Sequence, residues 1–208
     1  MFISPTHIED GTGLPFHERD TEILIDLFYA RTDGWQLEVA DRCINGWEHN
    51  GNPCITTKDR QGRDVNYVPD SAWAVLQIVL NYFETVGFFK MGPKKYRSFH
   101  YNYFRDGVYD VFPEFIDHPH NIARKLYSDA RGSLYHTGIN KGGVVLRHDR
   151  DTIAIAFEEG RRRLVIDPHL LVPRLREHLR DYCTQLKRTD EAELRENFRS
   201  SFIARIQG

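Results

Sequence analysis

Residues 71–93 read SAWAVLQIVLNYFETVGFFKMGP and predict the helix on which the fold depends. Asp70 or Ser71 can cap its start, and the segment is apolar on nearly all sides as far as Phe89. The Gly-Pro pair that follows stops the helix, because proline cannot continue it. A helix that is apolar all round is buried in a core. We therefore expect the rest of the chain to pack around this helix as a bundle.

Apolar spacing and turn residues predict further helices on both sides of the core helix. Before it, one helix begins at Glu18 or Asp20 and ends near Asp33-Gly34, and a second spans 35–47. After it, helices are predicted over 96–104, which a turn at Asp106-Gly107 follows, and over 121–137. A further helix begins with Pro168 and is capped by Asp167, and its buried face consists of Leu171, Leu175, Leu179, Tyr182 and Leu186. A charged helix from about Thr189 ends the chain.

Alternating apolar residues predict a small sheet before the last two helices. Strands are expected over 144–147, 152–157 and 162–166, with a turn at Glu159-Gly160. A second region of alternation, 50–69, predicts a peripheral hairpin. The fold class is therefore mainly α (α+β), a helical bundle with a small antiparallel β-hairpin or sheet before the C-terminal helices.

The expected organisation is one domain with two appended elements. At 208 residues the chain is long enough for one sizeable core. We expect residues 1–19 to form an N-terminal arm, 20–188 the single helical domain and 189–208 a charged C-terminal helix.

Composition excludes several classes of protein. Hydrophobic residues at 40% and charged residues at 28% are ordinary for a globular protein, which excludes disordered and fibrous classes. No signal peptide or bilayer-spanning stretch is recognisable, so we expect a cytoplasmic protein without a membrane partner. Cys43, Cys54 and Cys183 have no C-x-x-C spacing and indicate reduced thiols. We expect no cofactor and no metal.

The charges are distributed unevenly along the chain. Residues 1–120 carry 11 basic and 18 acidic side chains, whereas residues 121–188 carry 14 basic and 8 acidic ones. A local surplus of this size supports salt-sensitive contact with phosphates rather than the broad basic surface of a dedicated nucleic-acid binder. Any anionic partner is therefore expected at the basic segment, although many helical surfaces without such a partner are equally basic.

The basic segment contains the most informative motif of the chain. Residues 127–138 read YSDARGSLYHTG, in which Arg131 is followed by four residues and then His136, at the end of the predicted amphipathic helix. This pattern resembles the signature helix of the HEPN family. A glycine-marked exit, a hairpin, an Asp-Pro pair and a terminal amphipathic helix extend the resemblance over roughly 70–187. The family pattern allows four to six residues between the arginine and the histidine. Three other pairs fall in that range, none of which ends a predicted core helix: Arg42 with His49, and Arg162 and Arg163 with His169.

The resemblance implies a function. HEPN proteins are helical bundles, and many are metal-independent ribonucleases that act as dimers. It implies a metal-independent endoribonuclease with Arg131 and His136 as catalytic residues, acting on RNA as a toxin or defence effector, with an antitoxin or another protein as a possible partner. In one branch of the family a tyrosine two residues after the histidine is modified with nucleotides. Gly138 stands at that position here, so this regulation is not expected.

The chemistry of RNA cleavage fits these two residue types. Attack of the ribose 2′-OH on its own phosphate needs a base, an acid and a cation for the charge on the phosphate oxygens. His136 can act as acid or base near neutral pH, and Arg131 offers a fork that matches phosphate oxygens. The signature gives one such histidine per chain, so we expect a homodimer whose composite site contains both copies.

Two other functions compete with catalysis. In a non-catalytic HEPN-like module, the same surface binds nucleic acid or a partner protein. In a purely structural protein, Arg131 pairs with a carboxylate such as Asp129 or one from another helix, and His136 caps the helix end. Exposure of Arg131 and His136 across a dimer cleft favours the enzyme, whereas burial of both in salt bridges favours the structural role.

Further candidate residues flank the motif. Lys141 and the run Arg161, Arg162 and Arg163 are expected to contact an RNA backbone if His136 is catalytic, or else to be solvated strand ends. Residues 117–120, Asp-His-Pro-His, look like a metal clip, but no second cluster completes it and a polar loop explains them as well. The aromatic run 96–104 could stack bases, with core packing as the favoured interpretation.

Overall fold

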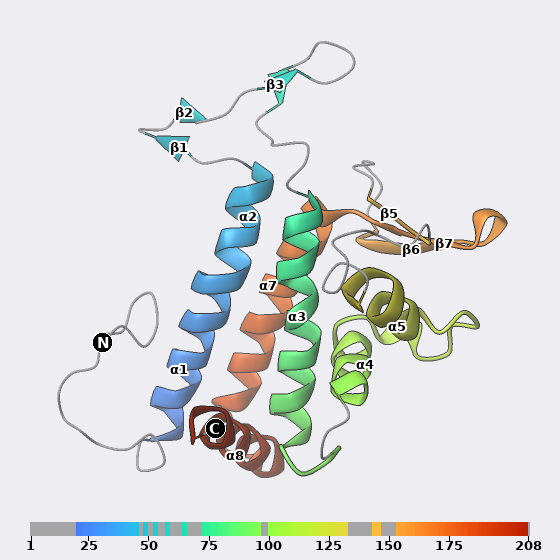
Figure 1. Cartoon of the computed structure of the whole chain (residues 1–208). Helices are drawn as coiled ribbons and strands as arrows, with labels where there is room; N and C mark the ends of the chain where they lie inside the picture. The colour runs from blue at the N-terminus through green and yellow to red at the C-terminus, as the bar shows by residue number, and fades with distance from the viewer. Residues whose placement is uncertain are drawn as a thin grey trace.

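The computed structural model describes residues 20–45, 48–49, 52–53, 57–58, 64–65, 72–96, 100–132, 143–146 and 153–207. Its described part is mainly helical with a small three-stranded sheet, as the sequence predicts. In Figure 1 the continuous segment of α1 (Thr21–Thr32) and α2 (Glu38–Asn45) stands beside α3 (Ala72–Met91) and α7 (Pro168–Leu186). Helix α8 (Ala192–Gln207) crosses below them, and α4 (His100–Val111), α5 (Ile122–Lys125) and the sheet lie on the far side of α3. The predicted arm, 1–19, lies outside the described residues.

The first helical segment is longer and more continuous than the sequence suggests. It comprises α1 (Thr21–Thr32), the π-helix η2 (Asp33–Leu37) and α2 (Glu38–Asn45). The Asp20 side chain accepts from the Glu22 N–H at 3.2 Å and caps it. The predicted end at Asp33-Gly34 is wrong, because the backbone continues through a wider π turn there instead of leaving the helix.

Helix α3 (Ala72–Met91) is the predicted core helix. It buries residues on several faces, including Leu76, Leu80 and Phe83, which are fully buried. Gly92 ends it with a φ of 81°, a left-handed conformation suited to glycine. By length and composition α3 could cross a membrane, but 61% of its apolar window is buried inside this molecule, as in the core helix of a soluble protein.

Helix α4 (His100–Val111) differs from the prediction. The expected turn at Asp106-Gly107 does not exist, and Gly107 lies inside the helix. A Cβ on Gly107 would lie 1.9 Å from the Phe83 carbonyl oxygen, and one on Gly87 would lie 1.9 Å from the Tyr103 carbonyl oxygen. These two glycines therefore allow the backbones of α3 and α4 to touch, which is why glycine occurs here without a turn.

The segment that contains Arg131 follows a short 3₁₀ turn, η4 (Pro113–Phe115). It consists of α5 (Ile122–Lys125) and the π-helix η5 (Leu126–Gly132). Asn121 caps it by accepting from the Arg124 N–H at 3.0 Å. Its apolar ridge is buried as predicted, at Ile122, Leu126 and Ala130. Whether it continues to Thr137 lies outside the described residues, which stop at Gly132.

The small sheet is mixed rather than antiparallel. Its strands are β5 (Val144–Leu146), β6 (Ile155–Glu158) and β7 (Arg163–Ile166), in the order β5-β7-β6. β6 and β7 form the predicted hairpin around the 3₁₀ turn η6 (Glu159–Arg161), with Ile155 opposite Ile166. β5 pairs with β7 in parallel, which corrects the antiparallel prediction. Local alternation identifies strands but does not fix the direction of a non-adjacent pair.

The last two helices close the core. Asp167 caps α7 (Pro168–Leu186) by accepting from the His169 N–H at 2.9 Å, and the predicted inner face of α7 is buried. The charged helix α8 (Ala192–Gln207) still buries Phe198 and Phe202. The predicted 50–69 hairpin corresponds in part to β3 (Thr57–Lys58) and β4 (Asp64–Val65), which pair antiparallel. Before them, β1 (Glu48–His49) and β2 (Asn52–Pro53) form a second antiparallel pair. These ladders project beyond the ends of α2 and α3 (Figure 1).

Asp110 joins three helices and predicts a dependence of stability on pH. It accepts from His178 Nε2 on α7 at 3.0 Å and pairs with Lys90 on α3. Burial raises the pKa of the Asp110 carboxyl, but the hydrogen bonds from His178 and Lys90 outweigh burial and hold the pKa below its ordinary value. A folded-state pKa below the unfolded one stabilises the fold above the unfolded pKa, and that stability is lost as the pH falls through the folded value.

We expect Asp110→Asn to lower the free energy of unfolding at pH 7 by about 1–3 kcal/mol, because hydrogen bonds to a charged group are lost. The difference from the wild type should shrink as the pH falls below about 4, the ordinary pKa of an aspartate. Urea unfolding at pH 7 and pH 3 measures both values. Asp190→Asn, in an exposed pair with Arg188, is the control and should change little at either pH. An equal loss from Asp110→Asn at both pH values would contradict this account.

Candidate functional site

Arg131 is anchored on the core helix α3. Its Nη2 donates to Glu84 Oε2 at 2.5 Å, and its Nε donates to Asn81 Oδ1 at 3.3 Å. The guanidinium also lies over the ring of Tyr127, 5.2 Å from the ring centre. These three contacts fix both the position and the plane of the guanidinium.

The local sequence explains why these side chains meet. Asn81 and Glu84 are three positions apart on α3 and therefore share one face of the helix. Tyr127 and Arg131 are likewise on one face of the helical segment that packs beside α3, below the buried ridge of Leu126 and Ala130. Burial of that ridge aims the polar side of η5 at the polar face of α3.

A histidine completes the cluster from a third element. His100, the first residue of α4, places Nδ1 2.7 Å from Glu84 Oε1. An ionised carboxylate only accepts hydrogen bonds, so His100 Nδ1 carries the hydrogen and donates it. One carboxylate thus receives the guanidinium on one oxygen and the imidazole on the other. We call Asn81, Glu84, His100 and Arg131 the Glu84 cluster.

Exposure separates the roles within the Glu84 cluster. The Glu84 side chain is 11% exposed, that of Arg131 is 28% exposed and that of His100 is 63% exposed. Glu84 is therefore a nearly buried acceptor, whereas Arg131 and His100 reach the surface. The hydrogen bonds from Arg131 to described residues use Nε and Nη2, and the side chain as a whole is partly exposed. The cluster can bind an oxyanion beside an accessible imidazole.

Two of the residues predicted from the sequence are not placed. His136 and Lys141 lie outside the described residues, as does the stretch between them and Gly132. The partner of Arg131 is placed, and it is Glu84 on another helix rather than Asp129. Asp129 instead accepts from the Ser128 hydroxyl at 2.7 Å.

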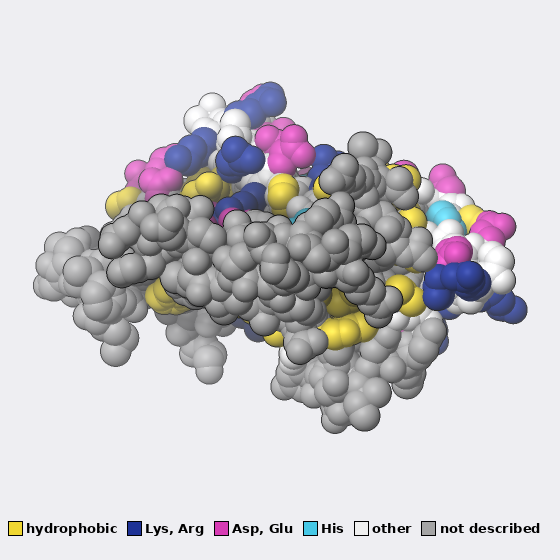
Figure 2. Space-filling view, turned by 90° about the horizontal axis from the view of Figure 1, so that it is seen from above, with side chains coloured by type: hydrophobic (Ala, Val, Ile, Leu, Met, Phe, Trp, Pro, Cys, Tyr) yellow, Lys and Arg dark blue, Asp and Glu magenta, His cyan; other side chains and the backbone are white. Residues whose placement is uncertain are grey.

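The three consecutive arginines, 161–163, differ in how far their charges are already paired. Arg163 donates to Glu158 Oε2 at 2.6 Å across the hairpin, so its charge is already paired. Arg161 is 65% exposed and only 3.7 Å from Glu158, and Arg162 is exposed with a left-handed φ of 51° at the end of the turn. In Figure 2 basic side chains gather at the right-hand edge, the side toward which the sheet projects in Figure 1. Arg161 and Arg162 are exposed and can be reached by a ligand, whereas Arg163 is held in its pair with Glu158.

A second polar chain is fully buried at one end, Tyr82, and partly exposed at His178 and Asp110. The hydroxyl of Tyr82 donates to His178 Nδ1 at 2.7 Å, and His178 Nε2 donates to Asp110. Burial is the main cause of a pKa for Tyr82 well above its ordinary value. Because Tyr82 is fully buried, a substrate cannot reach it. This chain joins α3, α4 and α7 rather than forming a reaction centre.

The two histidines of the 117–120 segment pack against the small sheet. His118 and His120 lie against the ring of Phe157, with ring centres 6.0 and 4.2 Å away, and His120 is 3.7 Å from Glu159. Among the described residues, no group of three or more His, Cys, Asp or Glu side chains could hold a metal ion. Two residues of the aromatic run, Tyr103 and Phe104, are buried in the core as the favoured interpretation predicts.

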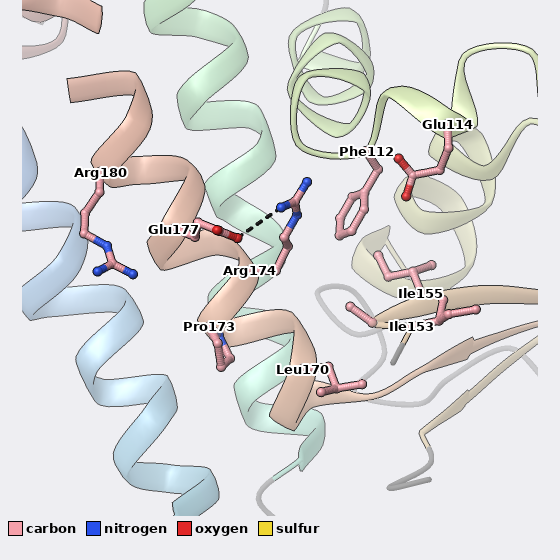
Figure 3. A pocket seen from close by; sticks show the side chains of 10 residues that line it. Phe112, Glu114, Ile153, Ile155, Leu170, Pro173, Arg174, Glu177 and Arg180 are labelled. Carbon is pink, nitrogen blue, oxygen red and sulfur yellow. Dashed lines mark hydrogen bonds and ion pairs between the residues drawn. The ribbon is translucent and has the colours of Figure 1, made fainter. Parts of the chain in front are cut away.

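A groove of about 560 Å³ lies on α7, away from these clusters. In Figure 3, Phe112, Ile153 and Ile155 gather on one side of Arg174, which pairs with Glu177 at 3.0 Å, while Arg180 points to another part of the wall. The described residues that line this groove include none of the predicted site residues and no histidine. Its lining mixes apolar side chains with two carboxylates, Glu114 and Glu177, and two arginines, Arg174 and Arg180, and Glu177 is already paired with Arg174.

Sequence reasoning identified Arg131 but missed Asn81, Glu84 and His100. Neither Asn81 nor Glu84 belongs to the sequence motif that identifies Arg131. A glutamate in the middle of an apolar helix is itself a signal, because a buried carboxylate requires cationic or hydrogen-bonding partners. His100 had no comparable signal, because its position depends on how α4 packs against α3.

The comparisons with known proteins give no match. No family model, no curated protein and no solved structure is significantly similar to the chain.

Proposed function

We propose that the chain is a metal-independent endoribonuclease of the HEPN type that uses Arg131 and His136. The observation that supports this proposal is the state of Arg131: its guanidinium is fixed by Glu84 and Asn81, and 28% of its side chain is exposed. A fixed guanidinium can accept phosphate oxygens without first losing side-chain entropy. The position of Arg131 just before His136 in the sequence matches the HEPN pattern.

In the proposed reaction, the ribose 2′-oxygen forms a bond to phosphorus and the bond from phosphorus to the 5′-oxygen breaks. A base removes the 2′-hydroxyl proton, and an acid protonates the departing 5′-oxygen. Arg131 stabilises the charge that gathers on the phosphate oxygens. His136 supplies one of the two proton transfers. The products are a 2′,3′-cyclic phosphate and a 5′-hydroxyl end.

The proposal extends to partners and location. The protein acts in the cytoplasm as a homodimer, with an antitoxin or another protein as its regulator and without a cofactor. Lys141, Arg161 and Arg162 contact the RNA backbone. Arg163 supports the hairpin whose turn contains Arg161 and Arg162, through its pair with Glu158.

A second candidate function is favoured by one specific observation. Arg131 is already paired with Glu84, as an arginine with an architectural role would be. Under this alternative the chain is a non-catalytic HEPN-like module, and the exposed arginines bind nucleic acid or a protein without cleavage.

Incubation with RNA in excess EDTA separates the two candidates. If the chain is the proposed enzyme, purified protein cuts single-stranded RNA without a divalent metal, because a guanidinium and imidazoles suffice for transesterification. Mass spectrometry of the fragments should show 2′,3′-cyclic phosphate ends. Cleavage that EDTA abolishes would contradict the proposed mechanism. Binding without cleavage, measured by gel shift over a salt series, would establish the alternative.

A further inference from the structure

The Glu84 cluster contains an imidazole that the sequence motif does not include. His100 comes from α4, 31 positions before Arg131 in the chain, yet both bind the same carboxylate. Its side chain is 63% exposed, so its other ring nitrogen is open to solvent and to a ligand. The charged groups that face it are Glu84 from α3 and, through that carboxylate, Arg131 from η5.

Glu84 determines which nitrogen of His100 can take a proton. Because Nδ1 donates its hydrogen to Glu84 Oε1 at 2.7 Å, the neutral ring carries its lone pair on Nε2. A carboxylate that binds one ring nitrogen orients the imidazole and stabilises the imidazolium formed when the other nitrogen accepts a proton. This is the arrangement that a general base requires.

From this geometry, and on the basis of the ribonuclease function proposed above, we infer that His100 is the general base that deprotonates the 2′-hydroxyl. Nε2 takes the proton as the 2′-oxygen bonds to phosphorus, and His136 gives its proton to the departing 5′-oxygen. Arg131 holds the phosphate beside His100, since both groups bind neighbouring oxygens of Glu84. Glu84 is a positioning residue that sets the tautomer of His100 and the plane of Arg131.

This inference changes what the dimer has to supply. The HEPN motif alone gives one imidazole per chain, and a composite site then needs two chains for one acid and one base. With His100 as the base, each chain contributes an imidazole beside its own phosphate-binding arginine, so the base need not be a second copy of the motif histidine.

A pair of substrates distinguishes the base from the acid. One is an RNA oligonucleotide, and the other is uridine 3′-(4-nitrophenyl phosphate), whose leaving group departs without protonation. His136→Ala should lose about 10²- to 10⁴-fold on RNA but little on the nitrophenyl ester, because only the acid is missing. His100→Ala should lose a similar factor on both substrates, because the 2′-hydroxyl still needs a base.

The pH dependence tests the role of Glu84. The rate of the wild type on the nitrophenyl ester should rise with pH as the base loses its proton, and His100→Ala should lack this limb. Glu84→Gln should alter the same limb, because a glutamine amide can donate to Nδ1 and reverse the tautomer. A purely structural role for Glu84 would lower the amount of folded protein without moving the limb. His118→Ala, which removes an imidazole that packs on Phe157, is the matched control and should keep the wild-type profile.

The outcomes separate this inference from the function on which it rests. An active wild type with an unimpaired His100→Ala variant overturns the role of His100 and leaves the ribonuclease proposal in place. Rescue of His100→Ala by the nitrophenyl ester would make His100 the acid and overturn its assignment as the base. A wild type inactive on both substrates overturns the proposed function and this inference together. Because His100 is 63% exposed, its replacement should leave the thermal unfolding midpoint nearly unchanged, which shows that any loss is not a loss of fold.

Discussion

Arg131→Ala and His136→Ala are each expected to lower the rate of RNA cleavage by about 10²- to 10⁴-fold. The loss for His136 follows from the removal of a group that transfers a proton in the transition state. The loss for Arg131 follows from phosphate charge that is no longer neutralised, an electrostatic effect of comparable size. Single-turnover cleavage of labelled RNA in EDTA, with enzyme in excess, measures the chemical step for each variant.

Two controls are needed for this measurement. Arg131→Ala also weakens the fold, because the nearly buried Glu84 carboxylate keeps its bond to His100 but loses the guanidinium on its other oxygen. Arg131→Lys keeps the positive charge but not the fork, and should recover folding more fully than activity. Arg188→Ala removes an exposed arginine paired with Asp190 and should retain full activity. Full activity in both Arg131→Ala and His136→Ala would mean that other residues carry the reaction.

The parts of the fold that the sequence predicted are those fixed by local rules. The buried faces of α3 and α7 follow from helical periodicity, and the Asp167 cap follows from the Asp-Pro pair that begins α7. Each of these signals is contained within a few turns of one helix. They suffice to place the core helix and the last long helix in a bundle.

The errors in the fold arose from contacts between distant residues. The sequence predicts a helix end at Asp33-Gly34, but Asp33 accepts from Arg176 Nε at 3.0 Å, 143 positions later in the chain. Arg176 also binds Glu38 and Asp41, so one arginine on α7 bridges to acidic side chains of both η2 and α2. An acidic residue before a glycine looks like a helix end until its distant partner is known.

The sequence predicts the arginine of the Glu84 cluster but not the residues that bind it. Arg131 was identified by its place in the motif, whereas its partner Glu84 and the histidine that shares Glu84 come from two other helices. Pairing of side chains across helices depends on the crossing of α3, α4 and η5, which local periodicity does not specify. The role of Arg131 was therefore proposed without the carboxylate that orients it.

The crossing of α3 and α4 is itself open to test, and we expect Gly107→Ala to destabilise the protein strongly. The new Cβ would lie 1.9 Å from the carbonyl oxygen of Phe83, a backbone atom that cannot move without its helix. Overpacking typically costs about 1–3 kcal/mol and occasionally more. Alanine regains only about 1 kcal/mol of helix propensity relative to glycine. Because the clash is with a backbone atom, we expect the cost to lie at the upper end of that range, which gives a net loss of about 2 kcal/mol in the free energy of unfolding.

The two glycines of this crossing should not act independently. Gly87→Ala meets the Tyr103 carbonyl oxygen at the same distance of 1.9 Å and should cost a similar amount. Separation of the two helices relieves both clashes, so the double variant should lose less than the sum of the single losses. Gly160→Ala is the control, since a Cβ there meets nothing within 4 Å, and its stability should stay within about 0.5 kcal/mol of the wild type. Urea unfolding of the four variants measures these differences. A stable Gly107→Ala protein would show that α3 and α4 do not cross as closely as described, and would also remove the basis for the placement of His100 beside Glu84.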